Sequence, residues 1–262
     1  MKHLFLVLSF FTTATFAQDS ALVKQVGEDI KLLPVLWQQQ SAEYRALCYQ
    51  AFNLATLRLE KIKTSGKANN YAIITDIDET ILDNSYYEAQ RIKDHTEFDM
   101  QTWKQWTYKA SATPVPGAVE FLQKAKQKGI TIFYVSNRDT SEVKSTILNL
   151  KKFQLPDADA NHLLFYSNKS SKEERRQIIS KKYNVVMLLG DNLNDFTQLF
   201  EKKSSNDRKT ETDNVKNEWG NKFIVLPNAT YGEWENALYD YERKLTPEQR
   251  DKKLKDKLTG IE

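Results

Sequence analysis

Short apolar runs alternate with helical stretches over the central part of the chain, from about residue 69 to residue 238. Five runs have the length and composition of buried strands: Tyr71–Ile74, Ile130–Val135, His162–Tyr166, Val185–Leu189 and Phe223–Leu226. Strands separated by helices are typical of βαβ units. The pattern therefore predicts an α/β fold, with a Rossmann-like, mainly parallel sheet flanked by helices.

Four segments depart from this alternation. Residues 18–68 form an N-terminal helical region, in which we expect helix from about Ala21 to Lys63 with an interruption near Pro34, and a polar break at 64–70. Residues 86–113 are an insertion rich in aromatic side chains, and we expect it to form a smaller α-helical cap region together with the N-terminal helices. Residues 202–217 are polar and predict a long surface loop. Residues 239–262 form a charged tail, either a terminal helix or partly disordered.

The first 17 residues resemble a secretory signal peptide. Lys2 provides the positive start, Leu4–Phe11 the apolar core, and Thr15–Ala17 the small residues before a cleavage point. A short buried helix is the alternative interpretation. The apolar run is too short to span a membrane, and no cysteine lies near the cleavage point, so we expect no membrane anchor. These features predict a secreted or periplasmic protein.

Several classes of function are disfavoured by composition. The net charge is only +3, and no stripe of Lys and Arg alternates with aromatic residues, so nucleic acid is not an expected partner. After the predicted cleavage only His95 and His162 remain, and neither lies in an Arg-His-Gly context, which argues against a histidine phosphatase. No G-x-S-x-G elbow occurs, which argues against a serine hydrolase.

Cys48 is the sole cysteine and falls on an apolar stripe with helical spacing, which indicates a core residue.

Carboxylates follow two of the predicted strands. Asp76 and Asp78 come directly after the first strand, and Asp191 and Asp195 come after the fourth. The carboxyl ends of parallel strands meet at one edge of the sheet, which is the usual ligand crevice. A single D-x-D is often only a loop motif, but two acidic motifs after strands predict a phosphoryl-transfer site. Asp76 is the candidate nucleophile and Asp78 the candidate general acid and base, while Asp191 and Asp195 are candidate Mg²⁺ ligands.

Two further segments offer groups that bind phosphate. Ser136 and Asn137 end the second strand, where a hydroxyl and the backbone amides of a helix start could hold a phosphate. The same residues are also common helix caps. Lys169 and Lys172 open a later helix, and either could contact phosphate or pair with Asp76, unless it is simply solvated.

These motifs resemble the haloacid dehalogenase (HAD) superfamily, and within it the class C secreted acid phosphatases, which include lipoprotein 5′-nucleotidases. The resemblance is carried by D-I-D-E-T at 76–80 and by G-D-N-L-N-D-F at 190–196. It extends over about residues 69–238, including the segments 115–121 and 226–232. The lipoprotein members carry a lipobox cysteine that this chain lacks. A homodimer is an expectation from the family alone.

The resemblance implies a role for each site residue. Asp76 would be the nucleophile and a metal ligand, and Asp78 the acid and base, with its backbone carbonyl on the metal. Asp191 would bind Mg²⁺ directly, while Asp195 would hold a metal-bound water. Ser136 would bind phosphate, and Lys172 fits the family lysine better than Lys169. Trp103 and Tyr231 match positions that line the leaving-group pocket, with simple core residues as the alternative.

The expected function is that of a secreted, Mg²⁺-dependent acid phosphatase. It would hydrolyse phosphomonoesters, including 5′-nucleotides and aryl phosphates, through an aspartyl-phosphate. Mn²⁺ or Co²⁺ could replace Mg²⁺ at oxygen ligands. The alternatives are a phosphatase of narrow specificity and a non-catalytic binding or storage protein on the same scaffold. A dehalogenase needs only one of the first two aspartates, and secretion argues against a phosphomutase.

Overall fold

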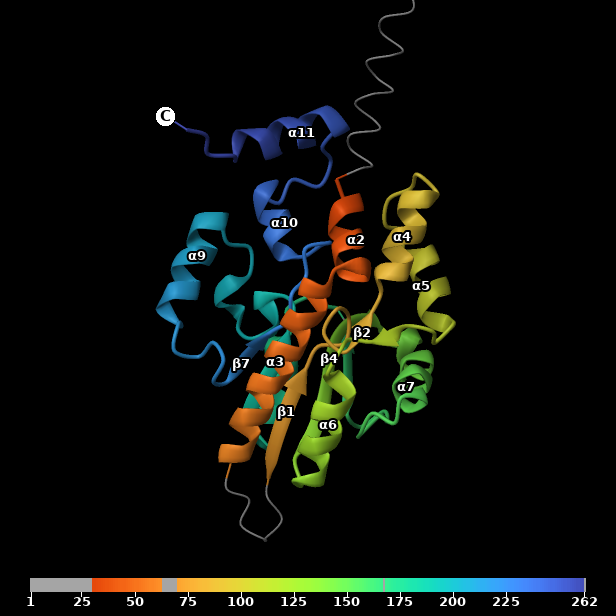
Figure 1. The fold of residues 1–262 in the computed structure, drawn as a ribbon, viewed down its shortest axis with the longest axis vertical. Coiled ribbons are helices and arrows are strands. Elements are labelled where there is room, and N and C mark those ends of the chain that lie inside the picture. The colour runs from red at the N-terminus through yellow and green to blue at the C-terminus, as the bar shows by residue number, and fades with distance from the viewer. Residues whose placement is uncertain (1–29, 63–69, 167, 262) are drawn as a thin grey trace, which may run out of the picture.

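The computed structural model describes residues 30–62, 70–166 and 168–261, so the predicted leader and most of the polar break lie outside the described residues. A five-stranded sheet forms the centre of the molecule (Figure 1). Its strands lie in the order β5 (Leu163–Tyr166), β4 (Thr131–Asp139), β1 (Tyr71–Thr75), β6 (Asn184–Gly190) and β7 (Phe223–Val225). All neighbouring strands pair in parallel, which confirms the predicted α/β fold.

Consecutive residues of β1 point to opposite faces of the sheet, and each face carries its own core. Ile73 belongs to the larger cluster, which includes residues of helices α3 (Ala42–Lys61) and α6 (Ala118–Gln127). Ile74 belongs to the smaller cluster, which includes Ile179 of helix α8 (Glu173–Ser180). Helices therefore cover both faces, and the ligand crevice is left at the ends of the strands. Cys48 of α3 is fully buried in the larger cluster, as predicted.

A helix begins at Leu32, two residues before Pro34 and directly after a turn at 30–31, and the residues before 30 lie outside the described part of the chain. A second break, which the sequence did not predict, lies at Ser41. Pro34 sits in the first turn of α2 (Leu32–Gln40), where the missing amide hydrogen costs little. Ser41 has extended backbone angles (φ −81°, ψ 138°), and its hydroxyl accepts a hydrogen bond from the Tyr44 amide at the start of α3. The break therefore comes from a serine N-cap.

The aromatic insertion forms two helices, α4 (Ser85–Lys93) and α5 (Met100–Tyr108). Its two ends are joined by a short antiparallel pair, β2 (Leu82–Asp83) with β3 (Thr113–Pro114). Helix α2 contacts this region through Gln38 Nε2, which donates to Asp83 Oδ1 at 2.8 Å. In Figure 1, α2, α4 and α5 lie beyond the carboxyl end of β1, whereas α3 runs beside the sheet.

Residues 202–217 contain a helix, α9 (Ser205–Asn214), so the prediction of a long loop there is wrong. Ser204 caps this helix by accepting from the Asp207 amide. Buried Arg208 anchors it by donating to the Phe200 carbonyl at 2.6 Å and to Asn194 Oδ1 at 3.1 Å. A helix is usually recognised in a sequence by a stripe of apolar residues. Helix α9 lacks such a stripe, because one arginine anchors it instead.

The remaining helices are α7 (Val143–Lys152), α10 (Glu233–Leu238) and α11 (Pro247–Asp256), with short 3-10 turns η1 (Thr140–Glu142), η2 (Leu193–Asp195) and η3 (Gln198–Phe200). Helix α11 begins with a capping box between Thr246 and Gln249, which accounts for a helix within the charged tail. Within the described ranges, every helix is too short or too polar to cross a membrane.

Candidate active site

Three carboxylates meet where β1 and β6 end. The two strands pair up to Thr75 and Leu189, and the Asp76 amide donates to the Leu189 carbonyl at 2.9 Å. Parallel pairing therefore brings Asp76 next to the second acidic motif. One carboxylate oxygen from each of Asp76, Asp191 and Asp195 lies within 4.8 Å of the others. These hard oxygen donors suit a divalent cation.

Burial and mutual repulsion make this cluster electrostatically costly. Burial raises the pKa of Asp76 well above its usual value, against the opposing charge of Lys172. Burial and the charge of Asp195 raise the pKa of Asp191 to about 7. Carboxylates packed in this way need positive charge nearby in order to remain ionised. The cluster therefore fits a site for a bound cation.

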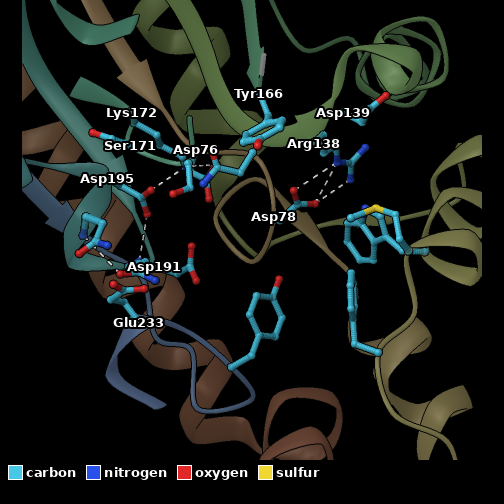
Figure 2. Close-up of a pocket in the computed structure, with 18 of the residues that line it drawn as sticks. Asp76, Asp78, Arg138, Asp139, Tyr166, Ser171, Lys172, Asp191, Asp195 and Glu233 are labelled. Carbon is cyan, nitrogen blue, oxygen red and sulfur yellow. Dashed lines mark hydrogen bonds and ion pairs between the residues drawn. The ribbon is translucent and has the colours of Figure 1, made fainter. Parts of the chain in front are cut away.

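Lys172 is the positive charge that the chain itself supplies. Its Nζ atom lies 2.6 Å from Asp76 Oδ1 and 2.6 Å from Asp195 Oδ1, and its side chain is buried (Figure 2). Burial by itself would lower the pKa of Lys172, but the two carboxylates raise it overall. Lys169, the other candidate, is exposed and pairs with Glu174. The structure thus places Lys172 beside Asp76.

Hydrogen bonds from the backbone and from neighbouring side chains hold both carboxylates of the second acidic motif in place. Asp195 Oδ2 accepts from the Asn192 amide at 3.0 Å. Asp191 accepts from Thr80 Oγ1 at 3.1 Å and from Asn228 Nδ2 at 2.8 Å. A Cβ atom added at Gly190 would lie 2.5 Å from the Asp195 side chain, so only glycine allows this close approach.

Asp78 occupies a separate position from the three-carboxylate cluster. Arg138 Nη2 donates to Asp78 Oδ1 at 2.8 Å, and Arg138 Nε lies 3.1 and 3.2 Å from the two carboxylate oxygens. Asn84 Nδ2 also donates to Asp78 Oδ1, at 2.9 Å. Figure 2 shows this pair on the right of the pocket, opposite Asp76 and Lys172. Sequence reasoning missed Arg138, although it follows Ser136-Asn137 at the end of the second strand.

The segment 136–138 presents Asn137 and Arg138 to the pocket, while Ser136 is fully buried. The Ser136 hydroxyl donates to Asp78 Oδ2 at 3.3 Å. Arg175 fixes the segment by donating to the Ser136 carbonyl and to Asn137 Oδ1, each at 2.6 Å. The N-cap of the 3-10 turn that follows, η1, is Asp139, so neither Ser136 nor Asn137 serves as an N-cap.

A pocket of about 690 Å³ opens in front of the aspartates. Trp103 and Tyr231, the two aromatic residues predicted for the leaving-group pocket, both line it. Trp103 is 9% exposed and packs edge-on against Tyr87, with ring centroids 5.2 Å apart. Further lining comes from residues that the motifs did not single out: Lys31, Phe98, Met100, Lys104, Asn194 and Tyr166.

Glu79 is a second residue that sequence reasoning missed. It has a left-handed backbone (φ 56°) and is 1% exposed. The Tyr231 hydroxyl donates to Glu79 Oε2, and the Asn84 amide donates to Glu79 Oε1 at 2.8 Å. Burial and the nearby charge of Asp78 raise the pKa of Glu79. Glu79 therefore links the turn after β1 to Tyr231, which together with Trp103 and Phe98 forms the aromatic wall of the pocket.

Comparison with known proteins agrees with this geometry. Residues 13–234 match the family model for HAD superfamily, subfamily IIIB (Acid phosphatase). The class C acid phosphatase from Bacillus anthracis is 38% identical in sequence and superposes with a TM-score of 0.85, over 91% of this chain and 100% of that chain. The structure of that phosphatase with tungstate bound matches at 37% identity, with the same TM-score and the same coverage.

The match extends over most of the chain and includes both acidic motifs. It therefore accounts for the parallel sheet as well as for the carboxylates at its edge. From this agreement of sequence, fold and site, the chain belongs to the subfamily IIIB acid phosphatases of the HAD superfamily and is a phosphomonoesterase.

Proposed function

We propose that this phosphatase is a Mg²⁺-dependent enzyme that acts outside the cytoplasm on 5′-nucleotides and aryl phosphates, through an aspartyl-phosphate on Asp76. The observation that carries the proposal is the position of the Asp76 carboxylate, which lies against Lys172 and within 4.8 Å of Asp191 and Asp195. A nucleophilic carboxylate needs such positive charge in order to approach an anionic phosphoryl group.

In the first step, an oxygen of Asp76 bonds to phosphorus and the bond from phosphorus to the leaving oxygen breaks. The Asp78 carboxyl gives its proton to that leaving oxygen, so the alcohol departs neutral. In the second step, water loses a proton to Asp78 and attacks phosphorus, which releases phosphate and restores the Asp76 carboxylate. Lys172 offsets negative charge beside Asp76 throughout.

The chain has a suitable set of ligands for Mg²⁺. Asp76, Asp191 and Asp195, together with the backbone carbonyl of Asp78, would hold the ion or its bound water. When bound, Mg²⁺ neutralises the clustered carboxylates and the phosphoryl oxygens. Asn137 and Lys172 supply donors for the remaining phosphoryl oxygens. A related phosphatase binds tungstate, a tetrahedral oxyanion like phosphate, which supports the same preference here.

The shape and the lining of the pocket support aromatic leaving groups. Its volume of about 690 Å³ falls in the range of pockets that enclose a whole small molecule. Trp103, Phe98 and Tyr231 present aromatic surface, on which a nucleobase or an aryl ring can stack. Stacking accepts any planar ring, so broad specificity is expected.

The proposal is tested by phosphate release from AMP and from p-nitrophenyl phosphate, across acid to neutral pH, with Mg²⁺ and with EDTA. We expect turnover that depends on the metal in the native chain. In Asp76→Asn the turnover should fall at least a thousandfold, while the protein stays folded. Asp159→Asn is the matched control, because Asp159 is an exposed carboxylate that pairs with His162 and does not line the pocket. Full activity in EDTA, or in Asp76→Asn, would refute the mechanism.

Export is tested separately. The chain would be expressed with its first 17 residues, and the N-terminus of the protein found outside the cytoplasm would be sequenced. A mature chain that begins at Gln18 supports the proposal. Retention of the intact chain in the cytoplasm would contradict it.

A further inference from the structure

Arg138 lies between the candidate acid and the aromatic wall of the pocket. On one side, its Nε and Nη2 atoms contact the Asp78 carboxylate at 2.8 to 3.2 Å. On the other side, its guanidinium carbon lies 5.8 Å from the centroid of the Trp103 ring. A third contact runs from Nη1 to Thr146 Oγ1 at 2.9 Å. The guanidinium is therefore held on three sides by partners from different parts of the chain.

The burial of this group makes its orientation well defined. The Arg138 side chain is 2% exposed, whereas that of Asp78 is 16% exposed and faces the pocket. Burial by itself would lower the pKa of Arg138, but the charges of Asp78 and Glu142 raise it. A planar guanidinium that grips a carboxylate with two nitrogens fixes the plane of that carboxylate as well as its distance.

We propose that Arg138 is a positioning residue, which orients the Asp78 carboxyl toward the leaving oxygen of the substrate. Because Arg138 also contacts Trp103, the position of the Asp78 carboxyl depends on the position of the aromatic wall. The inference rests on the proposed role of Asp78 as proton donor and deepens it.

The geometry leaves Asp78 able to act. Asp78 Oδ1 accepts from Arg138 and from Asn84, while Oδ2 accepts from Ser136 and from Arg138 Nε alone. Asp78 lines the pocket and its side chain stays 16% exposed, so part of the carboxyl remains open to substrate. Lysine cannot reproduce the contact, because its ammonium is a point charge with no planar fork. Arg138→Lys would therefore keep the charge and lose the orientation.

The inference has a distinctive consequence for substrates. The leaving oxygen of AMP would depart as a strongly basic alkoxide unless it receives a proton, whereas p-nitrophenolate is a stable anion. A misplaced acid should therefore slow transfer from AMP much more than transfer from p-nitrophenyl phosphate. The ratio kcat/KM reports the first step, in which the leaving group departs, and so isolates this effect from hydrolysis of the aspartyl-phosphate.

The experiment compares kcat/KM for the two substrates, with Mg²⁺, in native enzyme, Arg138→Lys and Asp78→Asn. We expect Arg138→Lys to lower the ratio of AMP to p-nitrophenyl phosphate by about tenfold or more, and Asp78→Asn to lower it further. Arg58→Lys is the control, because Arg58 donates to the Gly220 carbonyl and does not line the pocket. Its ratio should equal that of the native enzyme.

If Arg138→Lys does not fold, Thr146→Val removes only the hydroxyl that holds Nη1, and a smaller fall of the same ratio is expected. Equal losses with both substrates would overturn the inference, since they would indicate a general structural role. A rise in KM alone would also overturn it, since Arg138 would then bind substrate. If Asp78→Asn lowers the ratio and Arg138→Lys does not, only the inference fails. If Asp78→Asn leaves the ratio unchanged, the proposed acid fails, and the inference fails with it.

Discussion

The ammonium group of Lys172 lies 2.6 Å from the Oδ1 atom of Asp76, and both side chains are almost completely buried. The same ammonium is equally close to Asp195. A buried ion pair contributes little net stability, but removal of one partner leaves an uncompensated charge. Lys172 therefore compensates the charge of the acidic cluster in the folded protein, and in the proposed mechanism it also supplies charge for the reaction.

Replacement of Lys172 by methionine should destabilise the protein. At pH 7 in EDTA, the free energy of unfolding should fall by about 3–5 kcal/mol, because the carboxylates lose their buried partner. Urea denaturation measures this change. Lys169→Met is the matched control, since Lys169 is exposed and pairs with Glu174, and its effect should stay below about 1 kcal/mol. Similar effects of the two replacements would show that Lys172 does not compensate the cluster.

The stability of the metal-free protein should fall as pH rises from about 4 to above 7. Burial and Asp195 raise the pKa of Asp191 from 3.8 to about 7, so the folded state binds more protons than the unfolded state over this interval. Stability then decreases with pH, and the contribution is lost as pH passes through the folded pKa. Burial raises the pKa of Asp76 in the same direction.

Thermal unfolding in EDTA at a series of pH values checks this prediction. A divalent cation prefers the ionised carboxylates, so the rise in Tm that Mg²⁺ causes should grow with pH. Asp191→Asn should flatten the dependence measured in EDTA. A Tm that rises steadily from pH 4 to pH 7.5 without metal would contradict the assignment.

Replacement of Gly190 by alanine should impair the metal site. The new Cβ would lie 2.5 Å from the Asp195 side chain, so that carboxylate must move. We expect weaker Mg²⁺ binding, measured by calorimetry, and a loss of kcat/KM of at least tenfold. Gly129→Ala is the control. Gly129 has a φ of +77° with nothing within 4 Å of an added Cβ, so alanine costs about 1 kcal/mol of stability there and leaves the site intact. Equal Mg²⁺ affinity in the two variants would contradict the prediction.

The hydroxyl and the ring of Tyr231 should have separable roles. Tyr231→Phe removes a donor from the buried Glu79 carboxyl, so stability should fall by about 1–3 kcal/mol. The ring is retained, so KM for AMP should change little. Tyr231→Leu should raise KM for AMP severalfold, because the stacking surface is lost. Urea denaturation and steady-state kinetics measure the two effects.

Tyr108→Phe is the reference for the loss of a hydroxyl, since Tyr108 is exposed and bonds only to the surface residue Ser141 among the contacts described. Its effect on stability should be small. If Tyr231→Phe raises KM as much as Tyr231→Leu does, the hydroxyl contacts substrate and the separation is wrong.

The alternation of apolar runs and the two acidic motifs were enough to predict the sheet and its carboxylates. A strand buried on both faces must be apolar along its length, and parallel strands end at one edge, so Asp76 and Asp191 had to lie near each other. Lys172 could be preferred to Lys169 only by resemblance to the family. Its 2.6 Å contact with Asp76 comes from the packing of α8 against the sheet.

What the sequence did not reveal depends on partners far apart in the chain. Arg138 binds Asp78 although 60 residues separate them in the chain, because β4 pairs with β1. Near Arg138, the pairing of β4 with β5 also shifts register, between Val135 and Asp139. Helix α9 escaped detection because one buried arginine anchors it instead of an apolar stripe. Local periodicity therefore determined the strands and the acids of the site. Only the tertiary structure decided which polar side chains are buried together, because a polar group takes its hydrogen-bond partners from space and not from neighbours in sequence.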